Sequence, residues 1–85
     1  MIEITHVIAD ELGIHARPAG MLVKKCALFE CSIKIGTPAK MVDAKRIIGV
    51  MGLALKHGDE MIMAFDGPDE TAASEAVAAF LKENM

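Results

Sequence analysis

The chain lacks tryptophan and tyrosine, and only three phenylalanines stand among its 85 residues. Its core must therefore consist mainly of aliphatic side chains and methionine, of which there are seven. No apolar run approaches the length of a membrane span. Polar residues are interspersed throughout the first six positions, MIEITH, unlike the apolar run of a secretory signal peptide. We therefore expect a cytoplasmic protein that does not insert into a membrane.

Basic tracts and clustered cysteines are also missing. Twelve acidic residues outnumber nine lysines and arginines, giving a formal charge of −3, so nucleic-acid binding is not expected. Cys26 and Cys31 do not have CxxC spacing, and we expect reduced, partly buried thiols. No cluster of side chains has metal-ligand spacing, and neither a metal nor a cofactor is expected.

At this length we expect residues 1–85 to form one domain, with no room for a separate catalytic domain. Hydrophobic periodicity predicts strands over residues 2–8, 32–35, 40–42 and 60–65. It predicts helices over 16–28, 45–53 and from 69 or 70 to 83, with Asp43 as the N-cap of the second. The order βαββαβα predicts an α+β two-layer sandwich, with helices on one face of a mostly antiparallel sheet. The expected buried positions are Ala19, Leu22, Val23, Cys26, Ile33, Ile35, Ala73, Val77, Phe80 and Leu81.

The segment 13–19, GIHARPA, carries the clearest chemical pattern. Pro18 is tolerated in the first turn of a helix, which predicts that His15 and Arg17 lie at a helix N-terminus. Free N–H groups and the helix dipole favour an anion there. Because a histidine is a nucleophile and an arginine binds phosphate oxygens in pairs, the pattern indicates a phosphoryl group carried on an imidazole. The alternative, a surface histidine beside a solvated arginine, stays open from spacing alone.

This segment resembles the active-site signature of HPr, the histidine-containing phosphocarrier of the bacterial sugar phosphotransferase system. A second block, residues 44–53, is similar to the second helix of that family, and the resemblance extends over nearly the whole chain. It implies an open-faced sandwich with a four-stranded antiparallel sheet and three helices on one face. It also implies a monomeric phosphocarrier, not a stand-alone enzyme. Such a carrier receives phosphate from Enzyme I and passes it to sugar-specific Enzyme II A components.

The resemblance also assigns roles to residues. Nδ1 of His15 would accept the phosphoryl group, Arg17 would balance its charge, and the N–H groups of Ala16 and Arg17 would bind its oxygens. His6, which we place on the less apolar face of the first strand, and His57, in a turn, are not expected to react. The partner-docking residues would be Gly20, Met21, Lys24, Ile47, Ile48, Met51 and Gly52, although part of this set is expected to be ordinary packing.

Two positions depart from the family pattern. Arg46 stands where some relatives have a serine that an ATP-dependent kinase phosphorylates, so that regulation is expected to be absent. Leu12 replaces a small polar residue that often supports the histidine loop, which puts the geometry of His15 in question. A regulatory or binding module that acts by docking to partner proteins, as in the nitrogen-related branch of the system, remains the alternative function.

Overall fold

Four strands form one antiparallel sheet in the computed structural model, which describes residues 1–85. The strands are β1 (Ile2–Val7), β2 (Ser32–Thr37), β3 (Lys40–Asp43) and β4 (Glu60–Asp66). Their spatial order is β1-β4-β2-β3, so β4 pairs with both β1 and β2 in the middle of the sheet. The two-residue turn between Thr37 and Lys40 closes the β2–β3 hairpin.

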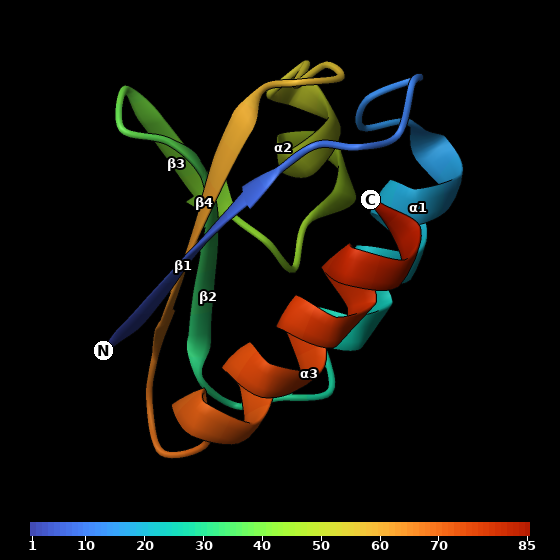
Figure 1. The fold of residues 1–85 in the computed structure, drawn as a ribbon. Helices are drawn as coiled ribbons and strands as arrows, with labels where there is room; N and C mark the ends of the chain where they lie inside the picture. Colours follow the sequence, from blue (N-terminus) through green and yellow to red (C-terminus); the bar gives the residue numbers. More distant parts are fainter.

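Three helices cover one face of this sheet (Figure 1). They are α1 (Ala16–Cys26), α2 (Ile47–Gly52) and α3 (Glu70–Asn84). Helices α1 and α3 lie side by side, α3 packs on β1 and β4, and the short α2 contacts β3 and α1 (Figure 1). The α+β open-faced sandwich and its order βαββαβα are thus confirmed.

The covered face of the sheet holds one continuous core. Met61, Met63 and Phe65 alternate along β4, and Ile33 and Ile35 lie beside them on β2. Nineteen buried hydrophobic residues form a single cluster, built from aliphatic side chains, methionine, two cysteines and only two phenylalanines. Nine of the ten positions expected to be buried are buried, and the tenth, Val23, is half-buried against the cluster.

Both cysteines lie in this core with free thiols. Burial raises the pKa of Cys26 to about 12. Burial also raises the pKa of Cys31, helped by the neighbouring Asp69 carboxylate. Both groups are therefore neutral thiols at physiological pH and poor nucleophiles.

The prediction that His6 lies on the less apolar face of β1 is wrong. Its cross-strand partner is Met61, and it shares the helix-covered face with Ile2 and Ile4. Residues two apart in a strand point to the same side, so the polar character of a single histidine does not change its face. Its Nε2 is buried and has no hydrogen-bond partner.

The start of the second helix also differs from the prediction. Asp43 ends β3, where it pairs with Lys34, and the next residue, Ala44, still donates its N–H to the Ile33 carbonyl. The Asp43 carboxylate accepts the Lys45 N–H in a local turn, and the N-cap is Arg46. Ladder pairing and this turn delay the helix to Ile47, two residues later than predicted.

The other boundaries shift by one or two residues. Strand β2 continues to Thr37, because Gly36 fits against the Lys40 carbonyl where a Cβ would clash. Helix α1 ends at Cys26, before the predicted residue 28.

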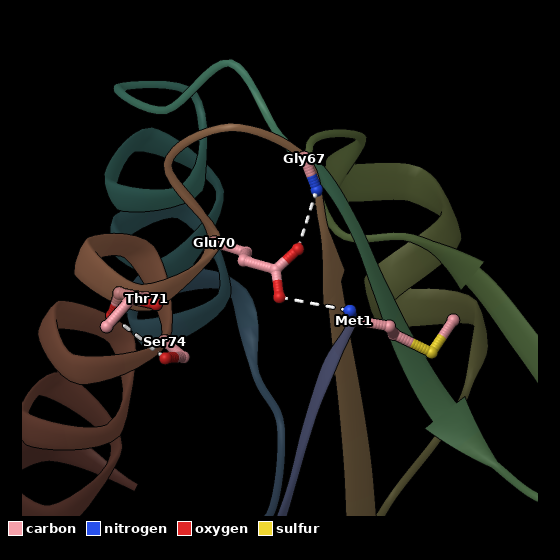
Figure 2. A network of polar contacts seen from close by, with 5 residues as sticks. All are labelled: Met1, Gly67, Glu70, Thr71 and Ser74. Atoms are coloured by element: carbon pink, nitrogen blue, oxygen red, sulfur yellow. Dashed lines mark hydrogen bonds and ion pairs between the residues drawn. The ribbon is translucent and has the colours of Figure 1, made fainter.

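A polar network joins the first residue of β1 to the start of α3 (Figure 2). One oxygen of Glu70 lies 3.0 Å from the Met1 amino group, and the other accepts the Gly67 N–H at 3.1 Å. The Gly67 N–H is the main cause of the lowered pKa of Glu70, and the Met1 ammonium adds to it. One turn further along α3, the Ser74 hydroxyl donates to the Thr71 carbonyl. The edge strand and the longest helix are therefore tied together at one end of the molecule.

Candidate functional site

The segment between β1 and α1 is held by backbone hydrogen bonds to two distant parts of the chain, residues 55–59 and the last residue, Met85. The Ile8 N–H donates to the Asp59 carbonyl, and the Ala9 N–H to the carbonyl of Met85. The Ile14 N–H donates to the Leu55 carbonyl at 3.0 Å. These bonds fix the loop immediately before His15.

Gly13 allows the close approach to Leu55. Its φ is +69°, a conformation that side chains disfavour, and a Cβ at this position would lie 2.5 Å from the Leu55 carbonyl oxygen. The glycine that opens the GIHARPA segment therefore has a packing reason as well as a conformational one.

His15 is the N-cap of α1, as the position of Pro18 predicted. Its backbone is extended, and its carbonyl accepts the first helical hydrogen bond, from the Ala19 N–H at 3.0 Å. The N–H groups of Ala16 and Arg17 donate to no acceptor in the protein, and Pro18 has no N–H. The start of α1 thus presents two free donors beside the imidazole.

The imidazole has one engaged and one free nitrogen. Its Nε2 lies 3.4 Å from Oδ2 of Asp10, while its Nδ1 has no hydrogen-bond partner. The side chain as a whole is 36% exposed. Nδ1, the ring nitrogen without a partner, is the one that the resemblance assigns to the phosphoryl group.

Asp10 is a site residue that sequence reasoning missed. Its Oδ1 accepts the Leu12 N–H at 2.9 Å, and its carbonyl accepts the Gly13 N–H, also at 2.9 Å. The Leu12 N–H is the main cause that lowers the pKa of Asp10, and His15 contributes. The pattern Asp-x-x-Gly over residues 10–13 is typical of a tight turn, and it could have predicted from the sequence the turn that Asp10 organises.

Arg17 is exposed and forms no ion pair. It lines a shallow pocket of about 290 Å³ whose other residues are Asp10, His15, Pro18, Met21 and Asn84. Asn84 comes from the far end of the chain, and no sequence pattern predicts that it lies at this site. The pocket combines a free nucleophilic nitrogen, an unpaired guanidinium and helix N-terminal donors, a set suited to a phosphoryl group.

The seven residues named for partner docking all retain exposed surface. Ile48 is 86% exposed, and Ile47 and Met51 are about two-fifths exposed, whereas Val50 faces inward and is fully buried. Gly20 and Ile47 adjoin, because a Cβ on Gly20 would lie 3.6 Å from Cδ1 of Ile47. Met21 and Lys24 on α1 and Gly52 on α2 are exposed as well. We call this set of seven the docking surface.

Comparison with known proteins gives the family. A family model described as the PTS HPr component phosphorylation site matches residues 2–83. The chain belongs to the HPr family. It is 47% identical over 76 residues to the phosphocarrier protein HPr of Lysinibacillus sphaericus, covering 89% of this chain and 86% of that protein. It is 38% identical over 79 residues to the HPr of Mycoplasma genitalium, covering 92% and 90% of the two chains.

Solved HPr structures share the fold. HPr-C-His from Thermoanaerobacter tengcongensis superposes with a TM-score of 0.92 at 32% identity, covering 98% of this chain and 93% of that one. A structure described as an HPr dimer from the same organism has a TM-score of 0.77 at 32% identity, covering 98% and 95%. The monomeric state implied by the resemblance therefore stays a prediction.

Membership in the HPr family establishes a phosphocarrier protein of the phosphotransferase system, not a stand-alone enzyme. Its partners belong to the same system. No helix of the structure is both long enough and apolar enough to cross a membrane.

The two departures from the HPr pattern have clear structural settings. The Leu12 side chain is 74% exposed, and only its backbone takes part in the turn that Asp10 organises. The Arg46 side chain is 81% exposed, with Nε 3.7 Å from Oδ2 of Asp43. Leu12 therefore leaves the loop intact, and Arg46 presents a guanidinium at the start of α2.

Proposed function

We propose that this protein accepts a phosphoryl group on Nδ1 of His15 from phosphorylated Enzyme I. It then donates the group to sugar-specific Enzyme II A components. The observation that carries this proposal is the free Nδ1 beside Arg17 and the unpaired N–H groups at the start of α1. An acceptor needs a lone pair, and the incoming phosphate needs positive partners that no other group already occupies.

The site is suited to passing the group on. The Arg17 guanidinium and the helix dipole offset the charge of the phosphoryl oxygens without a covalent bond to them. The bond between phosphorus and an imidazole nitrogen breaks readily once the ring is protonated, which keeps the transfer potential high. Because His15 lies in a shallow, open pocket and is 36% exposed, a partner's acceptor group could reach a phosphorus on the ring directly.

The docking surface lies on α1 and α2, and it meets this pocket at Met21 of α1, which belongs to both. We propose that it binds Enzyme I and the Enzyme II A components in turn, with the protein acting as a monomer in the cytoplasm. Arg17 and Lys24 carry unpaired positive charge there, which favours partners with acidic residues around their own active sites.

Mass spectrometry after incubation with Enzyme I and phosphoenolpyruvate tests the proposal. We expect the native protein to gain one acid-labile phosphoryl group. His15→Ala is expected to gain none while its far-UV circular dichroism stays native, because the side chain makes no cap hydrogen bond. His57→Ala is the matched control, since His57 lies exposed in the turn before β4 and its loss should leave labelling unchanged.

Labelling of His15→Ala would move the site to another residue and refute the assignment. A native protein that binds Enzyme I but takes up no phosphate would favour the alternative, a regulatory or binding module that acts by docking alone.

A further inference from the structure

The Asp10 carboxylate has two different partners, one on each oxygen. Oδ1 accepts the Leu12 N–H at 2.9 Å, and Oδ2 faces Nε2 of His15 at 3.4 Å. The first bond is a strong local contact, and the second is at the long end of hydrogen-bond distances. Hydrogen bonds in a resting site are often long and shorten when charge develops on the ring.

The backbone of Asp10 is fixed on both sides. Its N–H lies 3.3 Å from the Met85 carbonyl, and its own carbonyl accepts the Gly13 N–H at 2.9 Å. With the Leu12 bond on Oδ1, the carboxylate has one orientation, and Oδ2 is aimed at the ring. A rigid acceptor on one side of an imidazole determines which ring nitrogen carries the proton.

We propose that Asp10 is a positioning residue that holds the proton of His15 on Nε2 and so keeps the lone pair on Nδ1 for attack on phosphorus. This inference rests on the function proposed above and adds a residue to it. Asp10 also supports the loop itself, because its Oδ1 accepts the backbone N–H of Leu12.

The transfer step balances with no further reactant. The Nδ1 lone pair forms the new bond to phosphorus, while the bond between phosphorus and the donor breaks and its electron pair leaves with the donor. The proton on Nε2 stays in place, so the ring becomes positively charged. The ionised Asp10 stabilises that charge, as a carboxylate does beside the histidine of a catalytic triad. Onward transfer reverses these changes.

Asp10→Asn reverses the contact without changing the shape of the side chain. An asparagine has one oxygen, and the Leu12 N–H needs it as acceptor, so the amide NH₂ faces His15. A donor opposite Nε2 requires a lone pair there and moves the ring proton to Nδ1, which blocks attack. Asp10→Ser keeps an acceptor for the Leu12 N–H but does not reach the ring, so it separates loop support from proton placement.

Nitrogen-15 NMR of the neutral imidazole measures proton placement directly, on unphosphorylated protein. We expect Nε2 to be protonated in the native protein, Nδ1 in Asp10→Asn, and a mixture in Asp10→Ser. The rate of phosphorylation by potassium phosphoramidate, a donor that needs no docking, should fall at least about tenfold in Asp10→Asn and less in Asp10→Ser. Glu11→Gln removes the same charge from an exposed neighbour without a hydrogen bond, and it should match the native protein.

Two results would overturn the inference. One is an Asp10→Asn protein with native nitrogen shifts, whatever its rate. The other is an equal decrease in phosphorylation rate and an equal decrease in melting temperature in Asp10→Asn and Asp10→Ser. That result would indicate that Asp10 only supports the loop. Failure of the proposed function looks different, because the native protein itself would then take up no label from phosphorylated Enzyme I.

Discussion

The Asp69 carboxylate binds the backbone of Cys31, 38 residues earlier in the chain, at 2.9 Å. Its second oxygen accepts the Glu30 N–H at 2.8 Å. Asp69 is the N-cap of α3 but makes no cap hydrogen bond with its side chain. It joins the start of α3 to the start of β2, at the end of the molecule opposite to the start of α1 (Figure 1).

We predict that Asp69→Ala lowers stability without affecting phosphate uptake. It removes the acceptor of two N–H groups, and a donor left without a partner near the core is costly. Asp69→Asn is expected to lose less, since one amide oxygen can still accept. Urea denaturation at pH 7 followed by circular dichroism gives the midpoints. Asp66→Asn, an exposed residue whose side chain makes no hydrogen bond, is the control and should unfold like the native protein.

The contribution of Asp69 to the stability of the native state should decrease as the pH falls. The Glu30 N–H is the main cause that lowers the pKa of Asp69 from 3.8, and the Cys31 N–H contributes. A carboxylate with a lowered folded-state pKa stabilises the native state fully above its unfolded pKa, and the effect disappears as the pH falls through the folded value. The difference in urea midpoint between the native protein and Asp69→Asn should therefore be largest near neutral pH and should decrease below about pH 3.8. A gap that widens on acidification would contradict this sign.

Periodicity was enough to predict the order of the elements and most of the core, because both depend on patterns within one segment. The errors arose where distant contacts decide. Asp43 is a good cap residue, yet pairing with Lys34 keeps it in the sheet. The alternation of side chains along β1, and not the polarity of histidine, determines the side of the sheet on which His6 lies.

The candidate site divides in the same way. His15, Arg17 and Pro18 form a local pattern whose helix start could be predicted. Asp10 lies within the same loop, but its contact with the ring depends on how that loop folds back. Asn84 reaches the pocket only through tertiary packing of α3, which no local pattern reveals.

Arg17 should matter for transfer and little for folding, since it is exposed and forms no ion pair. A charge-assisted hydrogen bond contributes about 1.5–3 kcal/mol, so Arg17→Ala is expected to slow transfer from Enzyme I roughly ten- to a hundredfold. Arg17→Lys should restore only part of the rate, because an ammonium cannot bind two oxygens in parallel. Rapid-quench kinetics measures both variants, with Lys25→Ala as a control cation on the same helix. A native rate in Arg17→Ala would make Arg17 an ordinary surface residue.

Arg46 should prevent phosphorylation by the ATP-dependent kinase that acts on serine at this position in some relatives. A guanidinium offers no hydroxyl, and residues 41–63 contain no serine, threonine or tyrosine. We expect no acid-stable phosphate after incubation with ATP and such a kinase, and stable label on Arg46→Ser. Acid-stable phosphoserine on the native protein would show that a different site is used.

The exposed and buried sides of α2 should respond oppositely to substitution. Ile48 is 86% exposed and Val50 is fully buried, although they lie two residues apart on the same short helix. Ile48→Glu places a charge on the docking surface without touching the core. We expect it to weaken binding to Enzyme I at least about tenfold, the effect of a residue central to an interface, with little change in melting temperature.

Val50→Ala is the paired variant, and it should lose about 1–3 kcal/mol of stability through lost burial and the cavity left behind. While it stays folded, its affinity for Enzyme I should be close to native. Isothermal titration calorimetry and thermal unfolding on both proteins give the comparison. If Ile48→Glu lost stability and kept its affinity, α2 would be part of the packing alone, and the docking surface would have to be placed elsewhere on the molecule.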